Sequence, residues 1–361
     1  MSRSILNFGA GPAMLPEEVM LRAQSEFMDW QGTGKSVMEI GHRTDEFKSI
    51  AEHAEQSLRD ILAIPDNYHV LFLSGGATQQ FSVIPMNLLQ SKDSADYIHT
   101  GIWSQKAEQL AQRYCQTSIA CSSEESNFTS IPDLKDWQLN DDAAYVFYTD
   151  NETIGGLEFH SIPEIHSAPM VTDMTSSLLS KTIDVSRFGL IFAAAQKNIG
   201  PAGLTIVIVK KELCGDVPDF VPDLFNYQIQ AREKSMLNTP PTFNWYMAGL
   251  MFDWVKQQGG ISVLEKMNQQ KASLLYDFID ASDFYINKIH RDYRSRMNVV
   301  FTLSNDNLTT DFLKQAESKQ LHALKGHRLA GGMRASLYNA MPETGVKQLI
   351  HFMQEFEETH S

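Results

Sequence analysis

Short apolar segments of strand length alternate with helical segments between residues 69 and 209, and this alternation limits the folds open to the chain. Strands are expected at 69–74, 96–100, 143–148, 170–174, 190–195 and 204–209. Helices are expected at 77–89, with a kink at Pro85, and at 104–113. This order predicts an α/β fold in which helices cover a mostly parallel sheet. Ligands of such sheets bind at the carboxyl ends of the strands.

The pattern changes after about residue 258. A long amphipathic helix is expected at 261–279, a strand at 297–303, and helices at 310–320 and 345–358. The pair Gly259-Gly260 is a plausible boundary between the two parts. We therefore predict a large domain over residues 16–258, and a smaller α+β domain that combines residues 259–361 with residues 1–15.

Composition excludes several classes of partner. The 361 residues are enough for two packed domains, and the net charge of −14 disfavours nucleic acid and anionic membranes, though not a small anionic substrate. The three cysteines have neither metal-ligand nor disulfide spacing, and His160 and His166 have no metal-ligand spacing either, so we expect no metal. We see no signal peptide in residues 1–15 and no apolar run long enough to span a membrane, and we expect a cytoplasmic protein.

Lys197 is the residue with the strongest chemical implication. It follows the apolar run 190–195 and precedes the turn Gly200-Pro201-Ala202-Gly203. A lysine at the end of a buried strand is costly unless it has a role, and one such role is a Schiff base to pyridoxal phosphate. Asp173 ends another short strand and could hold the pyridine nitrogen of that cofactor. The alternative is an ordinary buried Asp–Lys ion pair.

Three weaker signals lie at other strand ends. The turn Gly75-Gly76 opens a helix whose free N–H groups could bind a phosphate, although it lacks the P-loop ending and could be only a turn. Trp103 directly follows a strand and could stack on a flat ring, although core packing is the commoner use of a tryptophan. Thr153 lies in a polar loop and could bond a ring hydroxyl, or could serve the turn alone. Their order along the chain is more informative than any one of them.

In that order the chain resembles the fold-type I pyridoxal-phosphate aminotransferases of class V, and among them the phosphoserine aminotransferase family. The resemblance covers essentially the whole length. The segments that carry it are Asn7–Pro16, Gly41-His42-Arg43-Thr44, Ser74–Thr78, Gln196–Gly203, Asn238–Thr242 and Gly331–Ala340. The last three segments are specific signs of this family, whereas a Gly-Gly turn is not.

The resemblance implies a seven-stranded, mostly parallel sheet in the large domain and the following roles at the cofactor. Lys197 forms the Schiff base and acts as general base and acid, and Asp173 binds the pyridine nitrogen. Trp103 stacks on the ring and Thr153 meets its phenolic oxygen. The phosphate is held by Gly76, Ala77 and Gln196, and by Asn238 and Thr239 from the neighbouring subunit of a homodimer with shared sites. Some relatives have a basic residue in the Gly76-Ala77 turn, which this chain lacks.

Substrates with two anionic ends need several cations, because arginine forks suit both carboxylate and phosphate. The resemblance assigns Arg334 to the α-carboxylate of the substrate. It assigns His42, Arg43, His327 and Arg328 to the distal phosphate or to the side-chain carboxylate of glutamate. An isolated His-Arg pair would otherwise be interpreted as a solvated surface group.

The expected activity is reversible amino transfer between glutamate and 3-phosphohydroxypyruvate, which yields 2-oxoglutarate and phosphoserine in serine biosynthesis. A role in pyridoxine synthesis, on a related phosphorylated keto acid, stays open. So do three alternatives: another small-substrate aminotransferase or a cysteine desulfurase, a non-catalytic pyridoxal-phosphate regulator, and a nucleotide-binding α/β protein. No cysteine lies in a motif that a desulfurase would use.

Overall fold

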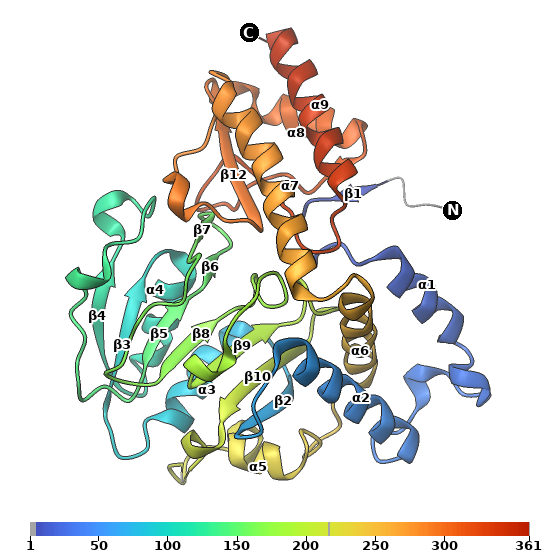
Figure 1. Ribbon diagram of the computed structural model, residues 1–361, viewed down its shortest axis with the longest axis vertical. Helices are drawn as coiled ribbons and strands as arrows, with labels where there is room; N and C mark the ends of the chain where they lie inside the picture. Colours follow the sequence, from blue (N-terminus) through green and yellow to red (C-terminus); the bar gives the residue numbers. More distant parts are fainter. Residues whose placement is uncertain (1–4, 216, 361) are drawn as a thin grey trace.

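The computed structural model describes residues 5–215 and 217–360, so residues 1–4 of the predicted small domain lie outside the described part. Figure 1 shows a broad sheet with its helices in the lower part of the molecule and a smaller group of strands and helices above it. The chain passes from the lower part to the upper through the long helix α7 (Ile261–Ala281).

The broad sheet confirms the expected α/β fold. Within the described residues seven strands follow one another in the order β2 (Tyr68–Ser74), β10 (Leu204–Lys210), β9 (Leu190–Ala194), β8 (Met170–Asp173), β5 (Val146–Thr149), β3 (Ser94–His99) and β4 (Gln116–Ser122). Neighbouring strands from β9 to β4 are parallel, and β10 runs antiparallel to both β9 and β2. The carboxyl ends of β5, β8 and β9 therefore meet at one edge of the sheet.

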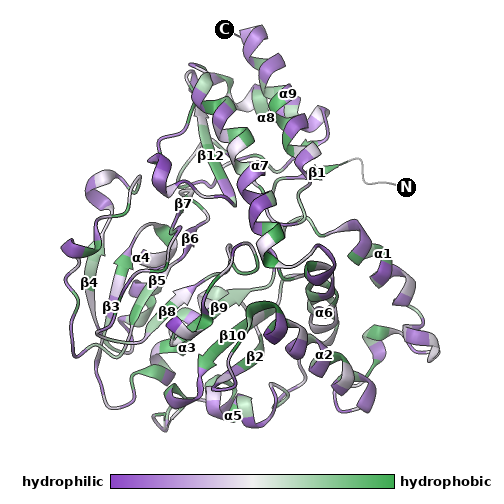
Figure 2. Ribbon diagram, in the orientation of Figure 1, coloured by the Kyte–Doolittle hydropathy of each residue, from purple (hydrophilic) through white to green (hydrophobic). Residues whose placement is uncertain are grey.

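Alternating side chains of each strand face two apolar layers. In β2, Val70 and Phe72 belong to one buried cluster, while Leu71 and Leu73 belong to another. Phe72 stacks on Trp245 of the covering helix, with ring centres 4.5 Å apart. Figure 2 shows apolar strands in the middle of the molecule and polar residues on its outer helices. Both faces of the sheet are thus buried, as in other mostly parallel sheets.

Two groups of helices cover these faces. One contains α1 (Glu17–Glu26), α2 (Asp45–Leu62) and α6 (Thr242–Gln257), and the other contains α3 (Ala77–Leu88), α4 (Ile102–Ala111) and the short α5 (Tyr227–Arg232). Pro85 lies inside α3, as expected. Single 3₁₀ turns occupy Trp30–Gly32, Val37–Glu39, Glu124–Ser126, Leu134–Asp136, Val185–Arg187, Lys211–Leu213, Asp223–Phe225, Arg291–Tyr293 and Asp306–Leu308.

The smaller part is built on the antiparallel strands β11 (Tyr285–Ile286), β12 (Asn298–Leu303) and β14 (Met333–Ser336). Helices α7, α8 (Thr309–Ser318) and α9 (Glu343–His360) pack around them. The N-terminal strand β1 (Leu6–Asn7) pairs in parallel with β13 (Leu321–His322), and Phe8 is fully buried in the same apolar cluster. Both ends of the chain thus contribute to one core.

A short hairpin connects the two parts. Its strands are β6 (Asn151–Glu152) and β7 (Leu157–Glu158), which follow β5 directly. The backbone N–H of Ser295 donates to the carbonyl of Gly156 at the tip of the hairpin, 2.9 Å away. No helix of the described chain is both long and apolar enough to cross a lipid bilayer.

Candidate active site

Lys197 lies just beyond the end of β9, on the turn that leads to β10. The backbone N–H of Gly200 donates to Ala195, 2.8 Å away, and closes this turn. Gly203 has a φ of +110°, which favours glycine, and the chain then enters β10. The Lys197 side chain is 8 % exposed and points into the protein.

The amine of Lys197 loses its proton more easily than that of an exposed lysine. Burial lowers its pKa to about 7, although the charges of Asp173 and Glu152 oppose this shift. Its Nζ donates a hydrogen bond to the hydroxyl of Thr153. A buried lysine that loses its proton near neutral pH is a nucleophile and a base.

Asp173 ends β8, the strand beside β9. One of its carboxylate oxygens accepts the backbone N–H of Thr175 at 2.8 Å. Burial raises the pKa of Asp173, while the hydrogen bonds from Thr175 and the charge of Lys197 act in the opposite direction. The charges of Lys197 and Asp173 stabilise each other, but the hydrogen bond of the Lys197 Nζ goes to Thr153.

These groups line one cavity of about 230 Å³. It contains seven of the predicted cofactor residues, namely Gly76, Ala77, Trp103, Thr153, Asp173, Gln196 and Lys197. Gly76 precedes the first residue of α3 and no side chain caps this helix, so its N-terminal N–H groups face the cavity without an intrahelical partner. An added Cβ at Gly76 would meet no atom within 4 Å, so the cavity is open at this end.

The sequence analysis missed several polar residues of this cavity. Thr149, Asn151, Thr175 and Ser176 also line it, and they follow β5 and β8. The signal that could have identified them is their position directly after, or at the end of, two predicted strands. Thr149 Oγ1 and Trp103 Nε1 are buried without a hydrogen-bond partner in the described structure. The cavity lining thus includes two side chains whose polar atoms are not satisfied within the described residues.

Arg334 approaches the same place from the small part of the molecule. It lies on β14, and its Nη1 donates to the carbonyl of Thr153, 3.4 Å away. Burial lowers the pKa of Arg334, and its Nε has no partner among the described residues. Arg334 and His327 also line an adjoining cavity of about 300 Å³, and the neighbouring Arg328 is exposed. The Arg334 guanidinium thus belongs to the lining of the 300 Å³ cavity and contacts Thr153, which lines the 230 Å³ cavity.

Five predicted residues lie outside the lining of these two cavities. Among the described residues, neither cavity is lined by His42, Arg43, Arg328, Asn238 or Thr239. Asn238 lines a third cavity with Gly75 and Gln79, and Arg43 is exposed just before α2. Their roles in binding the cofactor or the substrate stay a prediction.

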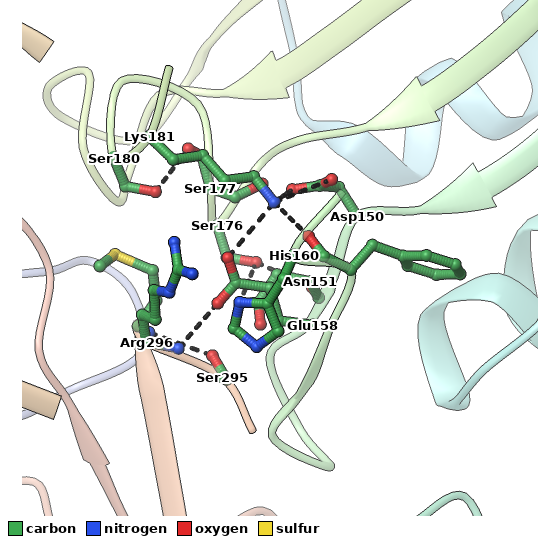
Figure 3. Close-up of polar contacts among 12 residues, drawn as sticks. Asp150, Asn151, Glu158, His160, Ser176, Ser177, Ser180, Lys181, Ser295 and Arg296 are labelled. Carbon is green, nitrogen blue, oxygen red and sulfur yellow. Dashed lines mark hydrogen bonds and ion pairs between the residues drawn. The ribbon is translucent and has the colours of Figure 1, made fainter. Parts of the chain in front are cut away.

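A buried ionic cluster holds the hairpin that carries Thr153 (Figure 3). The Lys181 ammonium lies 2.9 Å from Asp150 and 3.3 Å from Glu158. Burial alone would lower the pKa of Lys181, but the two carboxylates outweigh it and raise the pKa. Glu158 also accepts the backbone N–H of Arg296 at 2.7 Å, which connects the hairpin to the small part of the molecule.

The comparisons with known proteins agree with this geometry. The family model described as aminotransferase class-V matches residues 5–349. A phosphoserine aminotransferase of Pseudomonas aeruginosa (strain LESB58) is 54% identical over 360 residues, which cover all of both chains. The chain belongs to the phosphoserine aminotransferase family.

Solved structures of this family have the same fold. The phosphoserine aminotransferase from Bacillus circulans subsp. alkalophilus matches with a TM-score of 0.97 at 42% identity, over 99% of both chains. A phosphoserine aminotransferase from Trichomonas vaginalis, described as PLP bound, matches with a TM-score of 0.93 at 37% identity, over 97% of this chain and 99% of that one. The fold and the family expected from the sequence are thus confirmed.

Metal ligation has no support in the described residues. They contain no group of three or more His, Cys, Asp or Glu side chains arranged around a common point. The lining of the 230 Å³ cavity includes one acidic side chain, Asp173, and one amine. Its chemistry suits an organic cofactor with a carbonyl group, a ring nitrogen and a phosphate.

Proposed function

We propose that this chain is a pyridoxal-phosphate-dependent aminotransferase that transfers an amino group between glutamate and 3-phosphohydroxypyruvate, with 2-oxoglutarate and phosphoserine as products. The observation that carries the proposal is the joint placement of Lys197, Asp173 and Thr153 in one cavity at the N-terminus of α3. The naming of the family relatives supports the substrates. Serine biosynthesis is the corresponding pathway, and the three free thiols fit a reducing cytoplasm.

The cavity fits pyridoxal phosphate group by group. The free N–H groups of α3, at Gly76 and Ala77, and the side chain of Gln196 suit the phosphate. The carboxylate of Asp173 suits a protonated ring nitrogen, and the Thr153 hydroxyl suits the ring oxygen. Trp103 supplies an aromatic face from the first turn of α4. When bound, this cofactor supplies an electron sink for the pair of electrons left at the substrate Cα.

The residues of the chain perform the proton transfers. The Lys197 amine would hold the cofactor. With a substrate amine in its place, the free Nζ would take the proton from the substrate Cα and, in its acid form, would donate it to the cofactor carbon that is bound to the transferred nitrogen. A pKa of about 7 suits both steps, because base and acid forms are both populated near neutral pH. Asp173 keeps the ring nitrogen protonated through its negative charge.

Substrate anions are assigned to the cations nearest the cavity. Arg334 receives the α-carboxylate, because it lies beside Thr153 and has an unpaired Nε. His327 and Arg328 receive the distal phosphate or the side-chain carboxylate of glutamate. His42 and Arg43 complete this group from the partner subunit, since they lie away from both cavities of their own chain.

A homodimer with shared sites follows from the same reasoning. A twofold axis places equivalent loops reciprocally, so each subunit can complete the site of its partner. Asn238 and Thr239 are exposed and lie outside the cofactor cavity of their own chain. We assign them to the cofactor phosphate of the partner.

The test is an absorption spectrum of the purified protein with pyridoxal phosphate, before and after glutamate is added without a keto acid. A loss of the long-wavelength cofactor band, reversed by 3-phosphohydroxypyruvate, is expected. An unchanged band would favour a non-catalytic cofactor-binding protein. Borohydride reduction and peptide mapping should then label Lys197. A label on Lys181, which is paired with two carboxylates, would contradict the assignment.

A further inference from the structure

Glu152 is a fully buried carboxylate that the proposed reaction does not use. It belongs to β6 of the hairpin and its side chain is 0 % exposed. Burial raises its pKa, and hydrogen bonds from Ser104 and Trp103 act against this shift. A buried acidic group of this kind is costly unless its oxygens are satisfied.

Among the described residues, the carboxylate of Glu152 has its hydrogen bonds with the first turn of α4. One carboxylate oxygen accepts the backbone N–H of Trp103 at 3.0 Å. The other accepts the backbone N–H of Ser104 at 2.9 Å and the Ser104 hydroxyl at 2.8 Å. A carboxylate at a helix N-terminus also interacts favourably with the helix dipole. Glu152 therefore caps α4 from another element, and it acts together with the Ser104 hydroxyl of α4 itself, which accepts the backbone N–H of Gly101 at 3.0 Å.

The glycine before α4 makes room for this contact. A Cβ at Gly101 would lie 2.5 Å from the carboxyl carbon of Glu152 and 2.7 Å from its Cγ. The φ of Gly101 is 169°, an extended conformation that any residue adopts. Space for the carboxylate, and not backbone geometry, therefore requires glycine at this position.

The two residues that Glu152 connects both face the cofactor cavity. Trp103 lies on the helical turn that Glu152 caps, and Thr153 directly follows Glu152, at the start of the hairpin turn. We propose that Glu152 is a positioning residue that fixes the Trp103 indole relative to the Thr153 hydroxyl across the cofactor ring. This inference rests on the proposed function only in treating these two groups as cofactor contacts.

The charge of Glu152 also affects the pKa of Lys197. The negative charge of Glu152 acts to raise the pKa of Lys197, against the effect of burial. Removal of that charge should lower the pKa of Lys197 further. A change in pH dependence is a readout that loss of packing alone would not produce.

The main variant is Glu152→Gln in the complete protein loaded with pyridoxal phosphate. An amide has one accepting oxygen, so its NH₂ group must face either the Trp103 N–H or the Ser104 N–H, and two donors repel. We expect the Kd for pyridoxal phosphate to rise about tenfold, in proportion to one lost charge-assisted contact. We also expect the circular dichroism of the bound cofactor to change, and the pH midpoint of cofactor capture to move down.

Glu158→Gln is the matched control. Glu158 is similarly buried on the other strand of the same hairpin, but its carboxylate contacts Lys181 and the Arg296 N–H (Figure 3). In the part of the chain that the structure describes, it has no hydrogen bond to α4. General loosening of the hairpin would affect both variants alike. A specific role predicts that Glu158→Gln leaves the circular dichroism of the cofactor near that of the unmutated protein.

Gly101→Ala tests the same contact from the opposite side. Its methyl group would displace the carboxylate without removing the charge, so the circular dichroism and the Kd should change while the pH midpoint stays. This variant decides the question if Glu152→Gln does not fold. The proposal is wrong if both variants bind the cofactor like the unmutated protein, or if Glu158→Gln is affected as strongly. Failure of the unmutated protein to bind pyridoxal phosphate would instead overturn the proposed function.

Discussion

At the scale of single residues, the pKa of Lys197 determines how the enzyme takes up its cofactor. The amine must be unprotonated to attack an aldehyde, and a pKa of about 7 makes it half neutral near pH 7. The rate at which cofactor-free protein captures pyridoxal phosphate should rise with pH through about 7 and level off above about pH 8. Stopped-flow absorbance measures this rate, with Lys197→Ala as the control that forms no covalent link. A rate that keeps rising toward pH 10 would indicate an unperturbed lysine.

Asp173 should be needed for rate more than for binding. Asp173→Asn preserves the shape of the side chain but cannot hold the ring proton by charge. We expect the variant to retain much of its cofactor and to lose about a hundredfold in kcat, as is typical when one preorganised electrostatic contact is removed. Cofactor content by absorbance and kcat with glutamate measure the two effects separately. An unimpaired variant would show that another residue has this role.

Arg334 and Arg328 should differ in their effect on specificity. Every amino-acid substrate has an α-carboxylate, so Arg334→Ala should weaken all of them. Only phosphoserine has a distal phosphate, so Arg328→Ala should lower kcat/KM for phosphoserine about ten- to hundredfold more than for alanine. The ratio of the two kcat/KM values in each variant is the measurement. If Arg328→Ala leaves the ratio unchanged, this arginine does not recognise the phosphate.

At the scale of elements, the sequence predicted those parts whose pattern is local. The six predicted strands correspond to β2, β3, β5, β8, β9 and β10 with small differences at their ends. The strand β4 was missed because it is an edge strand rich in exposed polar residues. The helix α6 was missed because it is buried on nearly all sides and has no amphipathic period.

The start of α4 and the site around it depend on contacts that a local sequence pattern cannot predict. The helix begins at Ile102, earlier than the predicted residue 104, because Glu152 from a distant hairpin satisfies its first N–H groups. No local pattern around residue 102 contains that information. Lys197, Asp173 and Thr153 could be expected near one another because each lies at or soon after the end of a strand, and all three line one cavity. The contact between Glu152 and Gly101 exists only in the folded chain.

Helix α7 supplies a prediction about stability. The ammonium of Lys271 donates to the backbone carbonyls of Leu337, Tyr338 and Met341 at 2.9–3.1 Å, just after the strand that carries Arg334. Lys271→Met would remove a donor from all three carbonyls, of which only that of Tyr338 also accepts the Met341 N–H in the described part of the chain, and should lower the free energy of unfolding by about 3 kcal/mol. Urea unfolding measures the change, and Lys266→Met on the exposed face of α7 is the control. Equal stability of the two variants would show that water replaces the lysine.

At the scale of the whole molecule, we propose that the chain divides near residue 258 into a large and a small domain. The support is the separation of apolar clusters, since Phe8 packs with residues from 272 to 356. Arg334 belongs to the small part and Lys197 to the large part. A change in the angle between the parts would therefore alter the distance between the substrate carboxylate and the reacting amine.

The shared-site dimer predicts complementation between two inactive proteins. Lys197→Ala lacks the amine but retains Asn238 and Thr239, and an Asn238→Ala/Thr239→Ala variant lacks only the contribution to its partner. Each mixed dimer should contain one intact site. After equal amounts of the two variants are mixed, about half of all dimers at equilibrium should be mixed dimers. Activity after mixing, with subunit exchange shown by differently tagged chains, is the measurement. Exchange without recovered activity would mean that each site is built within one chain.

The pairing of β1 with β13 also has a consequence for the order in which the protein matures. A ribosome releases the N-terminus first, and the partner strand of β1 emerges only near the end of synthesis. The large sheet can form while translation continues, but the strand β1 must remain without its partner until β13 has been made. A nascent chain that stalls before residue 321 would therefore expose an unpaired strand and the Phe8 ring, the kind of surface that chaperones bind.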